Sequence, residues 1–369
     1  MDSQMKKCPL CDGNGKSLYA GLRDYLYETP GQWSMMQCCN TSCGLLWLEP
    51  RPTDKELRLA YQSYYTHENN TVPNSSSSAT LKRWIITGYL GARYGYKRET
   101  TSFIQRVISS LVYLLPTLRQ RFDMRVRKLS AHECGRVLDI GCGSGEWLQY
   151  MQDFGVAVQG LEVDPRAANV ARSRGLPVHI GPLENAGFSK QAFDTVTLSH
   201  VIEHVASPQD LLQQCNRILR PDGLLVVSTP NSSSFGHRIF GQYWRGLEPP
   251  RHLHLLNQRS LRTMVEAAGY AVVRCETFVH SDSIVRQSLS TAIRARRAHV
   301  PPSLPLWGRL YVRLLTMLEI CALPLRPRWG EEIYLKARKI RDVEASIESQ
   351  NVFIGGLAEA NADRKAVYG

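Results

Sequence analysis

Short apolar runs alternate with amphipathic stretches through the middle and end of the chain. Seven runs have the length and composition of buried strands, at Arg136–Ile140, Val156–Val163, Pro177–Ile180, Phe193–Leu198, Leu224–Ser228, Tyr270–Phe278 and Glu332–Ala337. Four segments between them repeat apolar residues at helical spacing, at Glu146–Phe154, Pro165–Arg174, Pro208–Leu219 and Arg259–Ala268. This alternation predicts an α/β fold in which helices cover both faces of a mostly parallel sheet.

The first 130 residues have a different pattern. Residues 1–50 are turn-rich and carry cysteines, and Thr71–Thr80 is a polar, serine-rich stretch. Apolar residues recur at helical spacing from Phe103 to Leu115, which predicts helices within residues 81–130. We expect Pro116 to end or kink that run.

These changes of pattern divide the chain into six expected segments. They are a zinc-knuckle segment at 1–50, a helical lid at 51–130 with a serine-rich linker near 71–80, an α/β core at 131–281, a basic helical insertion at 282–330, the last core strand at 331–340 and a tail at 341–369.

The positive charge of the chain is concentrated in two of these segments. The formal net charge is +12, yet residues 82–128 hold eleven basic residues against two acids, and residues 286–328 hold eight against one. One interpretation is a pair of amphipathic helical insertions whose cations are solvated. The other is a surface for anionic lipid or a phosphorylated substrate. Nucleic acid is not expected as a partner, because no reader motif is present.

The termini and the cysteine content bear on location. The N-terminus lacks the apolar stretch of a secretory signal, and no apolar run reaches the ~18–20 residues of a spanning helix. We therefore expect a cytoplasmic protein, monomeric or homodimeric, whose ten cysteines do not form structural disulfides. The basic segments add the alternative of peripheral contact with the inner face of the membrane.

A glycine-rich loop follows the first core strand. Glycines at 141, 143 and 145 would let a ligand approach the backbone and the following helix N-terminus closely. Glu146 stands where dinucleotide-binding loops have their third glycine, so the NAD fingerprint fails. Glu162 ends the second strand, where a carboxylate is placed to accept hydrogen bonds from ribose hydroxyls.

Val137–Gly145 (VLDIGCGSG) resembles the S-adenosylmethionine loop of class I methyltransferases. The later motifs of that family follow in order, as GLEVDP at 160–165, FDTVTLSHVIEHV at 193–205, LRPDG at 219–223 and STPN at 228–231. The resemblance implies a Rossmann-like, mostly parallel seven-stranded sheet. It also implies that Asp139, Gly141, Gly143 and Gly145 hold the methionine part of the cofactor, that Glu162 holds the ribose, that Leu183 and Glu184 flank the adenine, and that Ser199 and His200 lie beside the sulfonium. Pro182 stands where the family commonly has an acid.

A group of histidines follows two of the expected strands. If a helix begins at His200, then His200, Glu203 and His204 share one face, and His252 and His254 share one side if their segment is extended. Methyl transfer to oxygen needs a base or a cation at the acceptor hydroxyl. We expect His200, Glu203, His204 and His254 to be catalytic, with His200 as the base.

Two alternatives remain for these histidines. The pattern H-x-x-E-H resembles the E-x-x-E-H metal site of ubiquinone-pathway and small-RNA O-methyltransferases, which would place a divalent cation here. Because His200 replaces the first acid, Mg²⁺ is disfavoured and softer ions are favoured. The second alternative is that the histidines only form structural hydrogen bonds.

Four cysteines near the N-terminus have the spacing of a metal site. Cys8 and Cys11 form one pair, and Cys38 and Cys43 form a second, looser pair after 26 intervening residues. Two such pairs suit a structural Zn²⁺, which would leave no coordination position open for catalysis. Related chains carry a zinc-ribbon-like segment ending in C-G-L-x-W-x-x-P, here Cys43–Pro50, and this resemblance favours Cys38 over Cys39. The alternative is scattered thiols without a metal.

These features lead to one expected function and three rivals. We expect an S-adenosylmethionine-dependent methyltransferase. The tract Phe240–Leu255 resembles a bacterial subfamily associated with surface glycans and natural products, which implies O-methylation of a sugar hydroxyl on a nucleotide- or lipid-linked glycan. The rivals are C-methylation of a nucleotide-sugar, O-methylation of a small natural product, and a cofactor-binding scaffold without catalysis.

Overall fold

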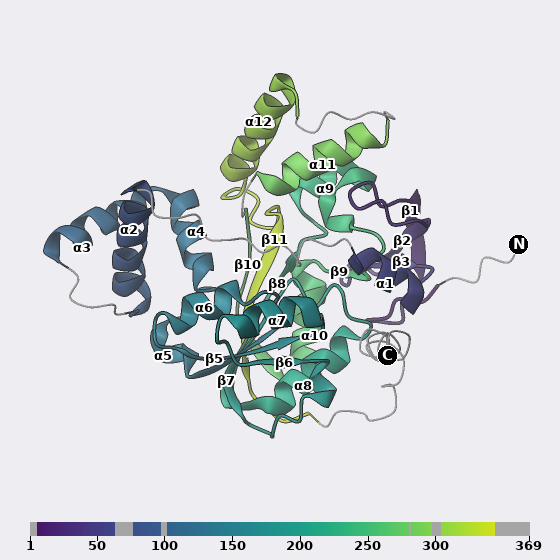
Figure 1. Cartoon of the computed structure of the whole chain (residues 1–369). Coiled ribbons are helices and arrows are strands. Elements are labelled where there is room, and N and C mark those ends of the chain that lie inside the picture. Colours follow the sequence, from purple (N-terminus) through teal and green to yellow (C-terminus); the bar gives the residue numbers. More distant parts are fainter. Residues whose placement is uncertain (1–5, 63–76, 97–101, 280–281, 297–303, 344–369) are drawn as a thin grey trace, which may run out of the picture. The chain divides into compact units, whose positions relative to one another are not determined.

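The computed structural model describes residues 6–62, 77–96, 102–279, 282–296 and 304–343 (Figure 1). The chain divides into two compact units. Unit 1 comprises Met1–Tyr64, Leu198–Asn216 and Val227–Gly369, and unit 2 comprises Tyr65–Thr197 and Arg217–Val226.

A seven-stranded sheet is the main element of the fold. Its order is β10–β11–β8–β7–β4–β5–β6. Its strands are β4 (Arg136–Ile140), β5 (Ala157–Glu162), β6 (Val178–Ile180), β7 (Phe193–Ser199), β8 (Leu219–Pro230), β10 (Tyr270–Phe278) and β11 (Glu332–Lys339). β5 pairs in parallel with both β4 and β6, whereas β10 and β11 are antiparallel. The predicted mostly parallel, seven-stranded class I methyltransferase sheet is confirmed.

The helices between these strands begin where local signals place them. They are α6 (Glu146–Gln152), α7 (Pro165–Ser173), α8 (Pro208–Ile218) and α10 (Gln258–Ala267). At α7, the Asp164 carboxylate accepts a hydrogen bond from the Arg166 backbone N–H at 2.9 Å, and Pro165 takes the first helical position. At α10, Asn257 caps the helix through the backbone N–H groups of Arg259 and Ser260.

The N-terminal fifty residues contribute three of the four strands of a second sheet that the sequence did not predict. β1 (Gly15–Leu22), β2 (Trp33–Cys38), β3 (Leu46–Glu49) and β9 (His254–Leu255) form it in that order. All its strand pairs are antiparallel, and β9 pairs with β3 at Trp47–His254 and Leu46–Leu255. Its core includes the buried side chains Trp33, Met35, Leu46, Leu48, Trp244, Leu247 and Leu255.

In its described residues, the expected helical segment at 51–130 contains four helices and a 3₁₀ turn. They are α1 (Asp54–Gln62), α2 (Ser77–Tyr94), α3 (Phe103–Ser110), η2 (Leu111–Leu114) and α4 (Pro116–Arg125), and the short helix α5 (Ala131–Cys134) follows. The helical run ends before Pro116, which begins α4. The serine-rich stretch near 71–80 was expected to be a linker, but α2 begins at Ser77, so its last four residues are helical. Residues 71–76 lie outside the described residues.

Helix α3 packs with its polar face inward. Gln105 donates a hydrogen bond to the Trp84 carbonyl at 2.7 Å, and Ser109 donates one to the Ile85 carbonyl at 3.0 Å, so polar groups join α3 to α2. Val112 is buried, but six apolar side chains of α3 and η2 are exposed instead, namely Phe103, Ile104, Val107, Ile108, Leu111 and Leu114. An ordinary surface helix has the opposite orientation. We call these six side chains the outer face of α3.

The basic insertion contains α11 (Ser283–Arg294) and α12 (Leu306–Ala322), which pack against each other in unit 1. Within the described parts of the chain, no helix is both long and apolar enough to cross a membrane. Glu319 of α12 is fully buried, and neither of its carboxylate oxygens has a hydrogen-bond partner among the residues that the structure describes. Burial and the neighbouring charge of Glu331 raise the pKa of Glu319 to about 9.

Candidate functional site

The loop after β4 carries three glycines with positive φ, at Gly141 (+70°), Gly143 (+54°) and Gly145 (+80°). At Gly145 a Cβ atom would lie 2.4 Å from Leu176 Cδ1 and 2.9 Å from Ala171 Cβ, so glycine is required for packing. At Gly143 a Cβ atom would meet nothing within 4 Å. The loop therefore leaves an open space beside Gly143, as a ligand that approaches the backbone requires.

Glu162, at the end of β5, closes this loop from the other side. Its Oε2 accepts a hydrogen bond from the Gly143 N–H at 2.8 Å, and its Oε1 accepts one from the Asp164 N–H at 2.9 Å. Burial raises the pKa of this carboxyl. Each carboxylate oxygen can accept more than one hydrogen bond, so Glu162 can hold the loop and still receive a ligand hydroxyl.

Asp139 is the acid that precedes the glycines, and it is buried with a partner that the sequence did not indicate. Arg127 contacts both carboxylate oxygens, and its Nη2 lies 3.2 Å from Oδ2. Thr197 of β7 donates a hydrogen bond to Oδ1 at 2.8 Å. The Arg127 guanidinium also lies 3.8 Å from the centre of the Trp147 ring. A buried carboxylate needs a cation, but residues 119–128 hold five basic residues that the sequence alone does not distinguish.

The remaining cofactor residues expected from the sequence lie in unit 2 or at its boundary. Leu183 and Glu184 are in the 3₁₀ turn η3 (Leu183–Asn185), where Leu183 is buried and Glu184 is exposed. Ser199 is the last residue of β7. Cys142 is buried and packs with Leu148 and Val178, as expected of a thiol without a chemical role.

His200 follows β7 in a bend, with a φ of +55°. No helix begins at His200, and the next helix, α8, starts at Pro208. The expected helical face is therefore absent. His200 still meets Glu203, with Nδ1 3.2 Å from Oε1, and its Nε2 lies 3.4 Å from Oε2 of Glu332 on β11. Partial desolvation lowers the pKa of His200 while the two carboxylates raise it, and the net result is a pKa well above the ordinary value. The side chain remains 43% exposed.

Glu203 is fully buried and accepts a hydrogen bond from the Thr229 hydroxyl at 3.0 Å. Burial raises its pKa, but the hydrogen bond from His200 and the charges of nearby histidines lower it to about 2. A carboxylate that stays ionised in the interior can orient the His200 ring and stabilise its protonated form.

His252, rather than His254, joins Glu203 and His204. One ligand atom from each of these three residues lies within 4.8 Å of the others, and the two imidazole rings are 4.7 Å apart. His254 is not in that group, although its backbone N–H donates a hydrogen bond to the Glu203 carbonyl at 3.2 Å. Its Nδ1 has no hydrogen-bond partner among the described residues, and burial and the charge of Arg51 lower its pKa to about 4.

A buried ion network fixes the segment that carries His252. Arg251 is fully buried and pairs with Asp24 at 2.7 Å and with Glu248 at 3.0 Å. Glu248 also lies 3.4 Å from Nε2 of His252, whose Nδ1 lies 2.7 Å from the Gly246 carbonyl oxygen. These contacts hold the His252 ring in one orientation beside Glu203.

Comparison with known proteins shows the family to which the chain belongs. A model described as a methyltransferase domain matches residues 105–274. A ubiquinone biosynthesis O-methyltransferase from a strain of Cereibacter sphaeroides is 34% identical over 142 residues, which cover 36% of this chain and 58% of that protein. Its counterpart from a second strain is 30% identical over 193 residues, covering 49% of this chain and 78% of that protein. The chain belongs to the S-adenosylmethionine-dependent methyltransferases.

Other similar proteins include a probable S-adenosylmethionine-dependent methyltransferase of Mycolicibacterium smegmatis, 34% identical over 149 residues. These cover 38% of this chain and 55% of that protein. Among solved structures, an S-adenosylmethionine-dependent methyltransferase from Archaeoglobus fulgidus covers 64% of this chain and 100% of its own, at 20% identity and a TM-score of 0.41.

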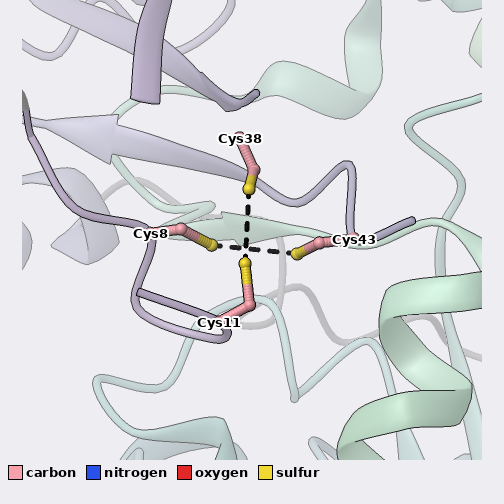
Figure 2. Close-up of side chains that lie close together, drawn as sticks. All are labelled: Cys8, Cys11, Cys38 and Cys43. Carbon is pink, nitrogen blue, oxygen red and sulfur yellow. Dashed lines mark hydrogen bonds between the residues drawn. The ribbon is translucent and has the colours of Figure 1, made fainter. Parts of the chain in front are cut away.

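This methyltransferase carries the expected group of four cysteines. Cys8, Cys11, Cys38 and Cys43 turn their sulfur atoms toward one common point (Figure 2), and all four sulfurs lie within 4.8 Å of one another. The Cys11–Cys38 and Cys8–Cys43 sulfurs are 3.5 and 3.8 Å apart. Tetrahedral Zn²⁺ with bonds of about 2.3 Å sets its ligand sulfurs about 3.8 Å apart. The geometry and the all-sulfur donor set therefore fit Zn²⁺.

The cysteine group is tied to the rest of unit 1 of the methyltransferase through α10. The Asn257 side chain donates hydrogen bonds to the carbonyls of Cys43 and Gly44, both at 3.1 Å. Asn257 is also the residue that caps α10. Loss of order at the cysteines would therefore disturb the start of that helix.

Proposed function

We propose that this methyltransferase transfers a methyl group to a hydroxyl of a sugar on a nucleotide- or lipid-linked glycan. The single observation that carries the proposal is the His200 imidazole held between Glu203 and Glu332 directly after β7, the strand that also contributes Thr197 to the Asp139 cluster. Relatives named O-methyltransferases support oxygen as the acceptor atom. The glycan acceptor rests on the resemblance of the tract Phe240–Leu255.

The residues around the β4 loop would hold the cofactor. Bound S-adenosylmethionine supplies an electrophilic methyl group on its sulfonium. In this proposal Asp139, through its Arg127 pair, and the backbone of Gly141, Gly143 and Gly145 hold the methionine part, while Glu162 accepts hydrogen bonds from the ribose. Leu183 and Glu184 flank the adenine, and Ser199 faces the sulfonium side. The open space beside Gly143 supports this assignment.

His200 would act as the general base. Because the two carboxylates raise the pKa of His200, the neutral imidazole is its minor form near neutral pH. In that neutral form, Nε2 would take the proton of the acceptor hydroxyl as the methyl group arrives. Glu332 and Glu203 then stabilise the imidazolium, because both carboxylates already face the two ring nitrogens. Glu203, His204 and His254 complete the proposed catalytic group, with His252 added on the evidence of its position. In-line displacement gains much of its rate from positioning.

A divalent cation held by Glu203, His204 and His252 is the alternative to metal-free catalysis. The three ligand atoms are close enough to share one ion, and a nitrogen-rich set suits Zn²⁺ better than Mg²⁺. In that version Glu203, His204 and His252 would hold the ion, which would supply Lewis acidity at the acceptor oxygen. Dialysis against a chelator, with the zinc of the cysteine group monitored separately, distinguishes the two versions by activity.

The test of the proposed function has two parts. Calorimetry measures S-adenosylmethionine binding to wild type and to His200→Ala, and methyl transfer is measured with nucleotide-linked and lipid-linked sugars. We expect His200→Ala to bind the cofactor as wild type does and to lose roughly 10²-fold or more in kcat, the usual scale for a general base. Cofactor binding without turnover in wild type, over a broad set of acceptors, would instead favour the scaffold. Turnover of a carbon acceptor or a small natural product would favour the other two rivals.

We also propose peripheral contact with an anionic membrane. The outer face of α3 exposes six apolar side chains, Phe103 at 80% and Leu114 at 75% of their surface. Over the described residues 77–96 and 102–128, Asp123 is the single acid among many cations, and it pairs with Arg93 at 3.1 Å. An apolar face rimmed by cations is typical of helices that lie in a membrane interface. Contact of this kind would serve a lipid-linked acceptor.

A further inference from the structure

Helices α11 and α12 line a solvent-open cavity of about 410 Å³ in unit 1, and its three arginines are exposed. Asp282, Arg286 and Ser290 line it from the side of α11, and Arg309 and Arg313 line it from α12. Leu304, just before α12, also contributes. Residues 282, 286 and 290 are spaced by one helical turn, and so are 309 and 313, so each helix turns one face toward the cavity.

The charge of this lining is unbalanced. Three guanidinium groups meet one carboxylate, and Asp282 already pairs with Arg286 at 2.5 Å. Arg309 donates its Nε–H to the Leu304 carbonyl at 3.1 Å, which leaves its two terminal nitrogens for another acceptor. Arg313 has neither a hydrogen bond nor an ion pair in the part of the chain that the structure describes. Like charges that converge without a counter-ion repel one another, so the cavity favours an anion.

The donor chemistry selects the kind of anion. Guanidinium groups present a planar fork of N–H donors that matches phosphate oxygens in pairs, and the Ser290 hydroxyl adds one more donor. The lining has a formal net charge of +2, which balances the charge of −2 on a diphosphate diester. The volume lies within the range of small-molecule sites.

We propose that this cavity binds the diphosphate group of a phosphorylated ligand. As the group through which the acceptor sugar is linked to its carrier, the diphosphate would hold the acceptor at unit 1; that link rests on the proposed function, whereas anion binding itself does not. A nucleoside diphosphate and a lipid diphosphate present the same chemistry. Exposed Leu306, Trp307 and Leu310 on α12 favour the lipid as its source.

The first experiment titrates inorganic pyrophosphate into the full-length protein by calorimetry. Wild type is compared with the double variant Arg309→Gln/Arg313→Gln and with the control Arg262→Gln. Arg262 pairs with Glu266 on α10, so the control removes a cation elsewhere. We expect the double variant to bind at least tenfold more weakly and the control to bind like wild type. Equal affinity in all three proteins, or no binding by wild type, would overturn the proposal.

A second variant guards against misfolding of the α11–α12 pair. Arg309→Lys/Arg313→Lys keeps the positive charge and removes the planar guanidinium groups. It should bind pyrophosphate more weakly than wild type and more tightly than the glutamine variant. S-adenosylmethionine binding is measured on the same samples. Loss of pyrophosphate binding with cofactor binding intact supports the cavity, whereas a wild type that binds pyrophosphate but not the cofactor contradicts only the proposed function.

Two further probes distinguish the source of the diphosphate. Uridine diphosphate is titrated in solution, and a polyprenyl diphosphate is presented in neutral phosphatidylcholine vesicles. Arginine-dependent binding of the vesicles above that of uridine diphosphate assigns the cavity to lipid-linked ligands, and the reverse order assigns it to nucleotide-linked ones. Binding of either probe that is unchanged in the glutamine variant counts against the cavity as its site.

Discussion

Arg127 and Asp139 form a buried ion pair in which both carboxylate oxygens contact the guanidinium. Arg127 comes from the segment after α4, whereas Asp139 lies on the central strand β4, directly before the glycine loop. Thr197 contacts both partners, so β7 is part of the same cluster. The position of the glycine loop therefore depends on a residue from the helical segment that precedes the core.

We predict that Arg127→Ala destabilises the protein and weakens cofactor binding together. Removing one partner of a buried ion pair costs about 3–5 kcal/mol, because the remaining charge is left unpaired. Chemical denaturation and calorimetry with S-adenosylmethionine measure the two effects. The control is Arg125→Gln, since Arg125 is exposed. A stable Arg127→Ala variant with normal cofactor binding would refute this role.

Two glycines of the loop should respond differently to substitution. Gly145→Ala should lower the free energy of unfolding strongly, because its Cβ atom would clash with Leu176 and Ala171. Gly143→Val should cost only about 1–3 kcal/mol of backbone strain, since its Cβ atom meets open space, but it should abolish S-adenosylmethionine binding. Denaturation and calorimetry on both variants test the contrast. If Gly143→Val bound the cofactor like wild type, the cofactor would lie elsewhere.

Glu319 should make the stability of the protein depend on pH. Its pKa is about 9 in the folded protein, against an ordinary value of 4.5. Above about pH 4.5 the unfolded chain loses this proton while the folded chain keeps it, so stability falls with rising pH until about pH 9, at about 1.4 kcal/mol per unit. The charges facing Glu319 and Glu331 are each other and Glu332.

Glu319→Gln removes the part of that dependence that Glu319 contributes, since the amide does not titrate, whereas Glu331, with a pKa of about 7, still titrates. We expect the variant to be more stable than wild type at pH 8 and closer to it at pH 5, measured by urea denaturation at both values. Glu266→Gln, at an exposed position of α10, is the control. A parallel shift of the variant at both pH values would mean that Glu319 does not hold a proton in the interior.

We predict one Zn²⁺ per chain, bound by the four cysteines. Elemental analysis of protein purified without a histidine tag measures it. Cys11→Ser should lose the ion and destabilise the sheet β1–β2–β3–β9 without removing cofactor binding, whereas Cys39→Ser, at the exposed neighbour of Cys38, should keep it. Zinc retained in Cys11→Ser, or lost in Cys39→Ser, would show that the ligand set is wrong.

The outer face of α3 should drive binding to anionic vesicles. Sedimentation with phosphatidylglycerol vesicles at low salt should show wild type bound, and high salt should release it, because screening reaches within about 8–10 Å. Phe103→Glu/Leu114→Glu should bind at least tenfold more weakly. The control Val273→Glu/Ile340→Glu makes the same changes at exposed positions elsewhere. Equal binding of wild type to phosphatidylglycerol and phosphatidylcholine would contradict the membrane assignment. It would also be contradicted if wild type formed dimers and the α3 variant alone were monomeric.

The core of the fold could be predicted because its signals are local. β4 and β10 begin and end where their apolar runs do, and Asp164 and Pro165 mark the start of α7. The sheet of β1, β2, β3 and β9 was missed although β1 has eight residues, because β3 and β9 have only four and two residues. Its register depends on a partner that is remote in sequence, which local patterning does not contain.

The site was predicted as a set of residue types more than as a geometry. The glycines and Glu162 were predicted because their spacing in the sequence is typical of a cofactor-binding loop and its acidic partner. Arg127 was missed because nothing local distinguishes it from neighbouring cations, and His252 was not preferred over His254 because both face the same way in an extended segment. In the structure, the ion network of Arg251 and Glu248 decides between them. Such choices depend on contacts between distant segments.

The pairing of β3 with β9 also fixes an order of events during synthesis. Leu46 and Trp47 meet their partners only when His254 and Leu255 have left the ribosome, roughly 10–40 s later at ordinary elongation rates. During that interval the nascent chain has an unpaired strand edge at β3, next to Cys43. Until β9 arrives, that four-residue edge is open to pairing with another strand.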